Sequence, residues 1–306
     1  MTRRGGALAA LAALTATAGA VQLSSAAFTA QDANTASFTS GDWVAPVVTL
    51  TTPAAGSLTN DATPTLSGSA GNLSGDGTTI TVRIYSGAST AGTLVQTRTA
   101  TRSGTSWTVD ATTLASAQYT VQASQTDAAG QTGTSAAHTF TVDAVRPSGT
   151  AVAAANGGAN AGRPESGDVI SFSFSEAITA TSLLAGWDGT ARTVQVRFTN
   201  STTSPTLDTF RIRDSAGNTT VKLDNNVATY ANVVTNTVNF AATMVRAADG
   251  PSVSVTLGTP NAPANIVAGT SGLVNMRWTT IAGPLDLAGN AINVANVTEA
   301  DGDRDF

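Results

Sequence analysis

Hydrophobic and polar residues alternate in short runs along most of this chain. Such runs cover residues 80–84, 119–124, 140–142, 170–175, 194–198, 210–213 and 252–257. Clusters of Gly, Asn, Asp and Ser separate the runs, and no long segment repeats its apolar residues at the helical spacing. A period of two between turn clusters is typical of antiparallel strands with one face in contact with solvent. The sequence therefore predicts an all-β protein.

The spacing of the runs also predicts how the chain is divided. About seven runs lie between Val47 and Val142, which is the strand density of an immunoglobulin-like sandwich. Pro147 then interrupts the pattern before a second set of runs begins. We expect tandem antiparallel β-sandwiches preceded by a cleaved signal helix. The expected boundaries are 1–27 for the signal peptide, 28–44 for an extended arm, 45–144 for the first sandwich and 145–306 for a second, larger one. The sequence leaves open whether 145–306 forms one enlarged sandwich or two small ones.

The composition argues against several classes of function and site. Only 11% of the 306 residues are charged, against about 25% in ordinary soluble domains, and the net charge is -5. No Lys/Arg cluster stands out beyond Arg3 and Arg4, so a nucleic-acid partner is not expected. The chain has no cysteine, which excludes disulfides, thiolate metal sites and a lipid anchor on cysteine. Modules of roughly 100 residues can fold without disulfides.

The N-terminus has the pattern of a secretory leader. Arg3 and Arg4 precede an apolar stretch over residues 7–23, and small residues follow at 24–27. We expect cleavage between Ala26 and Ala30, and the alternative is a buried N-terminal helix. The apolar stretch is short and weakly hydrophobic, so a stable membrane span is not expected. The protein is therefore predicted to be secreted or at the cell surface.

The residues after the leader carry a resemblance of their own. The sequences AFTA at 27–30 and NTASFTSG at 34–41 resemble the start of TasA/camelysin-type proteins, whose leaders are cut by a SipW-type signal peptidase. The resemblance covers about 20 residues. It implies that export route, and it implies fibre assembly only weakly because a different kind of domain follows.

The first predicted sandwich resembles a known family. The segments APVVTL at 45–50, TPTLSG at 63–68, DAAGQ at 127–131 and FTVD at 140–143 follow the order seen in bacterial Ig-like domains. In the second block, residues 167–176 and 286–290 resemble Ig-like domains of S-layer-type surface proteins. The segment 186–189 has no counterpart there. These resemblances imply Ig-like folds for both blocks.

One turn pattern occurs three times, at 127–131, 214–218 and 286–290. Its aspartates are Asp127, Asp214 and Asp286, and its glycines are Gly130, Gly217 and Gly289. Aspartate accepts bonds from nearby backbone donors, and glycine adopts positive φ at no steric cost. We interpret the pattern as a hairpin turn. The alternative is a calcium ligand or a recognition loop at a sandwich end.

The acidic C-terminus suggests one metal site. Asp301, Asp303 and Asp305 form the first half of a calcium loop, since calcium takes several carboxylate oxygens. The turn glycine and the distal glutamate of such a loop do not follow in the sequence, although Glu299 could contribute from upstream. The hypothesis is weak calcium binding, and the alternative is a frayed acidic tail. No other cofactor is suggested.

Few residues in the sequence suggest a catalytic site. The single histidine, His138, stands beside a predicted strand, and no G-x-S-x-G elbow is present. A glycosidase would need two carboxylates at a fixed separation, and nothing sets that separation. The candidates for such a pair are Glu165, Glu176, Glu299, Asp168 and Asp188. We therefore expect that the protein is not an enzyme.

Two kinds of function remain. The first is a structural or interaction protein at the surface, with the modules as spacers or as units that assemble through strand addition by residues 28–40. The partners would be copies of the chain or other surface proteins. The second is a carbohydrate- or host-binding adhesin with loops near Trp187 and Gly289. An exposed Trp187 would stack on sugars, whereas a buried one belongs to the core.

Overall fold

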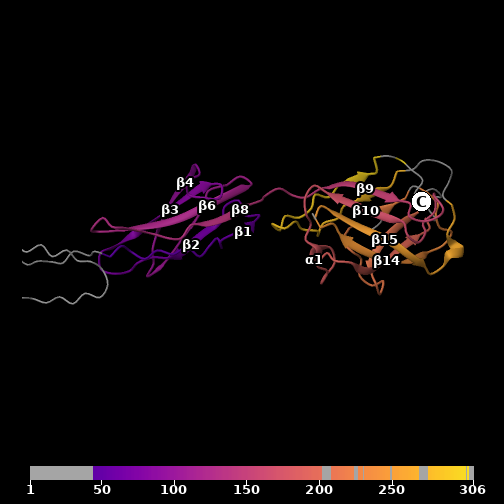
Figure 1. The fold of residues 1–306 in the computed structure, drawn as a ribbon, viewed down its shortest axis with the longest axis horizontal. Coiled ribbons are helices and arrows are strands. Elements are labelled where there is room, and N and C mark those ends of the chain that lie inside the picture. Colours follow the sequence, from indigo (N-terminus) through magenta and orange to yellow (C-terminus); the bar gives the residue numbers. More distant parts are fainter. Residues whose placement is uncertain are drawn as a thin grey trace, which may run out of the picture. The chain divides into compact units, whose positions relative to one another are not determined.

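The prediction of an all-β fold is confirmed. The computed structural model describes residues 44–201, 208–223, 227–229, 231–248, 250–268, 275–300 and 302. These residues form two β-sheet bodies (Figure 1). Each body has its own cluster of buried hydrophobic residues. The predicted signal peptide and nearly all of the predicted arm lie outside the described residues. No helix among the described residues has the length and apolar character needed to cross a membrane.

The first body contains eight strands. They are β1 (Ser57–Thr59), β2 (Thr65–Ser69), β3 (Asp76–Ser86), β4 (Leu94–Thr101), β5 (Ser106–Asp110), β6 (Ala117–Asp127), β7 (Thr132–Thr134) and β8 (His138–Val142). One sheet has the order β1-β8-β6-β3-β4 with β7 also on β6, and β2 pairs with β5 in a second sheet. The pair β1–β8 is parallel and the other pairs are antiparallel. The two shortest strands, β1 and β7, have three residues each, too few to show an alternation.

The core of the first body follows from the alternation. Ile80, Val82 and Ile84 on β3 are fully buried, and the polar residues between them face outward. Trp107 on β5 is 3% exposed, and its indole N–H donates to the Ser69 carbonyl at 3.0 Å. The hydrogen bond satisfies the one polar group of a large apolar side chain, as buried tryptophan requires.

The second body contains nine strands. They are β9 (Gly149–Ala155), β10 (Val169–Phe174), β11 (Arg192–Thr199), β12 (Thr209–Asp214), β13 (Val227–Ala228), β14 (Val238–Arg246), β15 (Ser252–Pro260), β16 (Arg277–Thr279) and β17 (Asn296–Thr298). They form one antiparallel sheet in the order β17-β16-β13-β12-β11-β14-β15-β10-β9. The short helices α1 (Ala180–Leu183) and η1 (Pro263–Asn265) lie in connections. One sheet and one cluster of buried residues make this block a single body.

Trp278 on β16 is central to the packing of the second body. Its side chain is fully buried and donates to the Leu223 carbonyl at 2.8 Å. Phe172 and Phe174 on β10 meet it edge-on, with ring centroids 5.2 and 5.3 Å away. Edge-to-face pairs at this separation add stabilisation beyond area burial. Trp278 thus packs the three-residue strand β16 against β10, which is distant from it in the strand order of the sheet.

Candidate functional site

The three repeated Asp-x-x-Gly segments form hairpin turns with a shared geometry. They span residues 127–131, 214–218 and 286–290. In each turn the aspartate Oδ1 accepts a backbone N–H four residues on, from Gln131, Asn218 or Asn290, at 2.8 Å. The glycines have φ of 85°, 73° and 96°, a region that L side chains rarely adopt. Each aspartate therefore stabilises its turn through Oδ1. Any further group that it binds would contact its second carboxylate oxygen, Oδ2.

The third turn brings three carboxylates together. Asp143 directly follows β8, Glu176 follows β10, and Asp286 begins the turn, with one oxygen of each within 4.8 Å of the others. The Oε1 atom of Glu176 is buried without a hydrogen-bond partner. Burial raises the pKa of Glu176, and the charges of Asp143 and Asp286 raise it further. Clustered carboxylate oxygens of this kind are the ligands that Ca²⁺ prefers.

Neighbouring polar groups hold this cluster in place. The Asn290 side chain donates to the Asp143 carbonyl at 2.7 Å and to Asp286 Oδ2 at 2.8 Å. The Arg146 guanidinium donates to the Ala291 carbonyl at 2.8 Å. These bonds tie the connection after β8 to the loop that carries Asp286. Within the described part of the chain, this is the one group of three acidic or histidine side chains close enough to share an ion.

The sequence also predicted a metal site in the acidic tail. Asp301, Asp303 and Asp305 lie outside the described residues, so the calcium hypothesis for them stays a prediction. The suggested contribution of Glu299 to that site also stays a prediction. Its side chain is 6% exposed, and its two oxygens accept backbone N–H groups of Met276 and Ala154. Both carboxylate oxygens thus have backbone donors within the second body.

The other acid–base candidates have structural hydrogen bonds. Asp168 is fully buried and accepts the backbone N–H groups of Gly157, Gly158 and Glu165. Asp188 accepts the backbone N–H and the hydroxyl of Thr190, and these two bonds lower its pKa. Each carboxylate stabilises its own turn.

Two further residues considered for catalysis, His138 and Glu165, also have hydrogen-bond partners. Nδ1 of His138, the first residue of β8, lies 2.9 Å from the Pro53 carbonyl oxygen. Glu165 Oε2 accepts the Asn160 side-chain amide at 2.9 Å, and the side-chain and backbone bonds from Asn160 lower the pKa of Glu165. Both residues connect neighbouring segments of the backbone.

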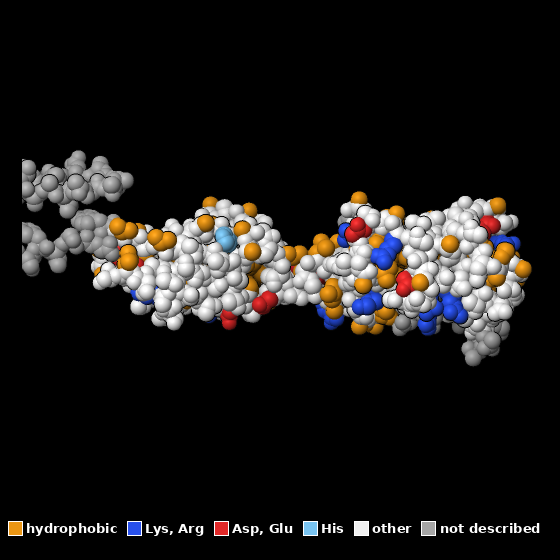
Figure 2. Space-filling model, turned by 90° about the horizontal axis from the view of Figure 1, so that it is seen from below, with side chains coloured by type: hydrophobic (Ala, Val, Ile, Leu, Met, Phe, Trp, Pro, Cys, Tyr) orange, Lys and Arg blue, Asp and Glu red, His pale blue; other side chains and the backbone are white. Residues whose placement is uncertain are grey.

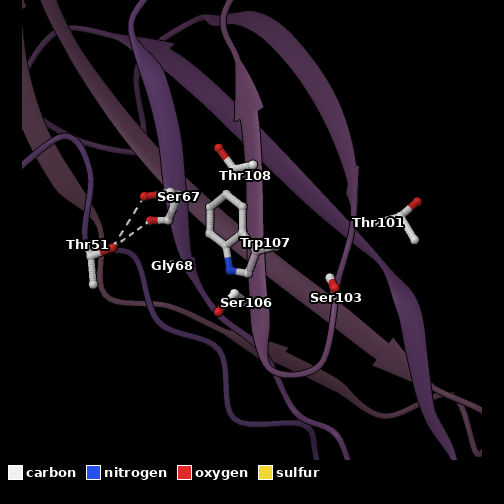
Figure 3. A pocket seen from close by; sticks show the side chains of 8 residues that line it. All are labelled: Thr51, Ser67, Gly68, Thr101, Ser103, Ser106, Trp107 and Thr108. Atoms are coloured by element: carbon white, nitrogen blue, oxygen red, sulfur yellow. Dashed lines mark hydrogen bonds between the residues drawn. The ribbon is translucent and has the colours of Figure 1, made fainter.

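The tryptophan proposed for sugar stacking is in the core. Trp187 is 1% exposed and donates to the Thr190 carbonyl at 2.6 Å, so its ring faces are covered. A shallow hollow of about 440 Å³ lies instead beside Trp107, between Thr51, Ser67 and Ser106 (Figure 3). Trp107 is itself 3% exposed, so little of its ring is open for stacking.

A basic hollow on the second body was not expected from the sequence. Arg197, Arg211 and Arg213 line it with Thr199 and Thr209, around about 380 Å³. Arg197 on β11 is directly opposite Arg211 on β12, and side chains so paired lie on one face of a sheet. The sequence pattern that could have predicted this hollow is the spacing of two between Arg211 and Arg213 on β12, beside Arg197 on β11. The arginines are not consecutive, so they do not form a run of charges in the sequence.

The basic hollow stands out because charges are sparse elsewhere. Figure 2 shows a surface made mostly of uncharged side chains, and on the face in view most Lys and Arg side chains lie over the second body. The Nε atom of Arg213 is buried without a hydrogen-bond partner. Guanidinium groups bind carboxylate and sulfate-like oxygens with two parallel hydrogen bonds. The hollow can therefore accept an anionic group.

The family comparison agrees with the fold of the first body. Residues 51–144 match the family model of the bacterial Ig-like domain. The predicted resemblance of the first block to this family is thus confirmed. Bacterial Ig-like modules are typical of surface and secreted proteins. No curated protein matches the chain.

Several solved structures match the chain at low similarity. The fibronectin(III)-like modules of CbhA from Clostridium thermocellum are 14% identical, with 83% of this chain and 93% of that one covered and a TM-score of 0.26. Dimeric latent PorU from Porphyromonas gingivalis is 16% identical, with 72% and 20% covered and a TM-score of 0.26. The BSP domain of a biofilm associated protein is 15% identical, with 84% and 29% covered and a TM-score of 0.21.

Proposed function

We propose that this chain is a non-enzymatic, secreted or cell-surface structural protein whose Ig-like modules act as spacers or assembly units. The observation that carries the proposal is the match of residues 51–144 to the bacterial Ig-like domain, in tandem with a second all-β body. Each body has its own core, so we expect each to fold without depending on the other. A sparsely charged surface of hydroxyls and amides suits an extracellular spacer.

Location is the first test of this proposal. The producing cells are fractionated, and intact cells are labelled with an antibody raised against residues 45–144. The expected result is protein in the medium or on the cell surface, with an N-terminus that begins between Ala26 and Ala30 by mass spectrometry. Protein confined to the cytoplasm with its leader intact would overturn the proposal.

Assembly would use the arm that follows the leader. We propose that the segment 28–40 adds as a strand to the edge strand β4 of a second copy. Among the described residues β4 pairs only with β3, and Leu94 and Val95 at its start are 48% and 44% exposed. An open edge with exposed apolar residues is a template for a further strand. The resemblance of the start of this segment to TasA/camelysin-type proteins supports assembly only weakly.

Light scattering separates the assembly unit from a monomeric spacer. The mature chain should grow in mass with concentration, whereas a chain that begins at Pro46 should remain monomeric. Val95→Lys on β4 should block growth, because charge at an edge disfavours pairing. Leu73→Lys, at an exposed loop position, is the matched control and should assemble normally. Equal masses for the long and short chains would exclude the arm.

A second candidate function is binding of an acidic carbohydrate, and the arginine hollow is the observation that favours it. An adhesin of this kind would use Arg197 and Arg211 rather than Trp187, which is buried. On a glycan array, sulfated or uronate glycans should bind and neutral ones should not. The double change Arg197→Gln, Arg211→Gln should remove binding. Binding that is unchanged in this variant would exclude the hollow.

A further inference from the structure

We propose that the arginine hollow of the second body binds a phosphomonoester group on a sugar, in preference to a sulfate ester or a carboxylate. Three arginines and two threonines line the hollow around about 380 Å³, namely Arg197, Arg211, Arg213, Thr199 and Thr209. This volume is near the lower end of the range for small-molecule sites, which suits one small unit. The inference rests on the second candidate function, the binding of an acidic carbohydrate, and specifies which acidic group is bound.

The strand register brings the three arginines together. Arg197 on β11 is directly paired with Arg211 on β12, and Arg213 lies two residues further along β12. Directly paired residues have Cα atoms about 4.5 to 5.5 Å apart, and two residues along a strand span about 7 Å. Phe210 and Ile212, which alternate with the arginines of β12, are buried in the core. The arginines therefore share the outer face of the sheet.

This arrangement is unfavourable unless an anion compensates it. Like charges directly opposite each other on a sheet are destabilising. The whole chain has only 15 Lys and Arg among 306 residues, so abundance does not explain three arginines in one hollow. The Nε atom of Arg213 is buried without a hydrogen-bond partner. An anion in the hollow would reduce the repulsion and accept from this unused donor.

The described neighbours of the hollow supply little negative charge. Asp208 is fully buried, and its side chain accepts three backbone N–H groups. Asp214 ends β12, and its carboxylate accepts two backbone N–H groups of its own turn. On the adjacent strands, the residues directly paired with two of the arginines are uncharged, Asn239 on β14 and Gln195 on β11. A bound ligand is thus the natural source of the compensating charge.

The donors of the hollow match a doubly charged group with several oxygens. A phosphomonoester carries about −1.5 to −2 charge at pH 7 and has three terminal acceptor oxygens. A sulfate ester carries a single negative charge, and the two oxygens of a carboxylate are satisfied by one guanidinium. Three guanidiniums around one group therefore favour the phosphate. The hydroxyls of Thr199 and Thr209 are further donors at the same hollow.

Isothermal titration calorimetry on the purified chain compares glucose-6-phosphate, glucose-6-sulfate and glucuronate in a buffer without phosphate. At pH 7.5 the phosphate should bind about tenfold more tightly than the other two, the value of one further charge-assisted hydrogen bond. The dianion fraction of a phosphomonoester falls from about 97% at pH 7.5 to about 10% at pH 5, because its second pKa is about 6. The preference should therefore fall to about twofold at pH 5. The sulfate ester does not titrate in this range, so it controls for changes in the protein.

Two variants with the same change in charge locate the site. Arg213→Gln should weaken the binding of glucose-6-phosphate about tenfold and that of glucuronate less, because Arg197 and Arg211 remain for the carboxylate. Arg83→Gln is the control, since Arg83 is exposed on β3 of the first body, and it should change neither affinity. The comparison of ligands on the wild type needs no variant, so it decides the proposal even if Arg213→Gln does not fold.

The outcomes separate this inference from the function on which it rests. Sulfate or glucuronate binding as tight as phosphate binding at pH 7.5 would overturn the inference and leave the acidic-carbohydrate function in place. No binding of any of the three sugars, with a blank array of acidic glycans, would remove that function as well. Inorganic phosphate is the last competitor and should bind more weakly than glucose-6-phosphate. Equal binding of the two would exclude the sugar as the carrier of the phosphate.

Discussion

The Oε1 atom of Glu299 accepts the backbone N–H of Ala154 at 3.3 Å and so connects the two outer strands of the nine-stranded sheet. Ala154 lies on β9, and Glu299 directly follows β17. Oε2 of the same carboxylate accepts the Met276 N–H at 2.9 Å. One buried side chain thus satisfies two backbone donors where the ends of the sheet approach each other. Edge strands protected in this way are poor templates for another chain.

Replacement of Glu299 should therefore destabilise the second body. Glu299→Ala leaves two buried N–H groups without their acceptor and should lower the free energy of unfolding by about 1 to 3 kcal/mol. Glu299→Gln keeps one acceptor oxygen and should cost less. Urea unfolding followed by circular dichroism measures both. A Glu299→Ala protein as stable as the wild type would show that the carboxylate is not needed to close the sheet.

Two glycines should respond to alanine in different ways. A Cβ at Gly68 on β2 would lie 2.0 Å from the Thr49 carbonyl oxygen and 3.0 Å from the Trp107 ring. Gly68→Ala must therefore displace backbone. Gly130 has open space around its Cβ position, and only its φ of 85° opposes a side chain. We expect Gly130→Ala to cost about 1 kcal/mol and Gly68→Ala clearly more, by thermal unfolding. The reverse order would contradict the packing of the 49–51 segment on β2.

The sequence predicts the strands of this fold well because period two has a direct physical cause. Ile170, Phe172 and Phe174 are buried on β10 while the serines between them face outward, as the alternation requires. The number and order of strands were harder to predict. β1 and β7 are too short to alternate, and the single sheet of the second body depends on β13, which has two residues. Tertiary pairing, not local pattern, determines such strands.

The candidate sites were predictable only in part. The Asp-x-x-Gly turns are visible in the sequence because their geometry is local. The partners of the turn aspartates come from far along the chain, such as Asp76 for Asp127 and Asp143 for Asp286. No spacing rule brings residues 143 and 286 together, and only the fold does. The arginine hollow has the same origin, because its residues belong to two strands.

Asp168 should make the second body sensitive to pH. Burial raises its pKa above the usual 3.8, although backbone N–H groups of Glu165, Gly157 and Gly158 oppose the shift. Below 3.8 the carboxyl is protonated in both the folded and the unfolded states. Between 3.8 and the raised folded pKa, the folded state binds more protons, so stability falls as the pH rises through this window. Urea unfolding at a series of pH values from 3 to 7 measures the slope.

The variant Asp168→Asn isolates this effect. It should remove the contribution of Asp168 to the slope while lowering overall stability by about 1 to 3 kcal/mol, because an amide offers one acceptor oxygen to three backbone donors. Asp188→Asn changes a carboxylate with a lowered pKa and serves as the control, since it should not remove that slope. If the slope is the same in wild type and Asp168→Asn, another group is responsible for it.

The two bodies should unfold as separate units. Their cores share no residue, and each contains one large tryptophan on a strand of its own sheets, Trp107 on β5 and Trp278 on β16. Trp278→Ala should lower the stability of the second body by about 3 to 5 kcal/mol, since truncation leaves a cavity and unpairs the Leu223 carbonyl. The first body should keep its transition, because distant sites without shared partners act independently. Trp107→Ala should do the converse. Differential scanning calorimetry resolves the two transitions, and a shift of both by either variant would show that residues 45–300 unfold as one cooperative unit.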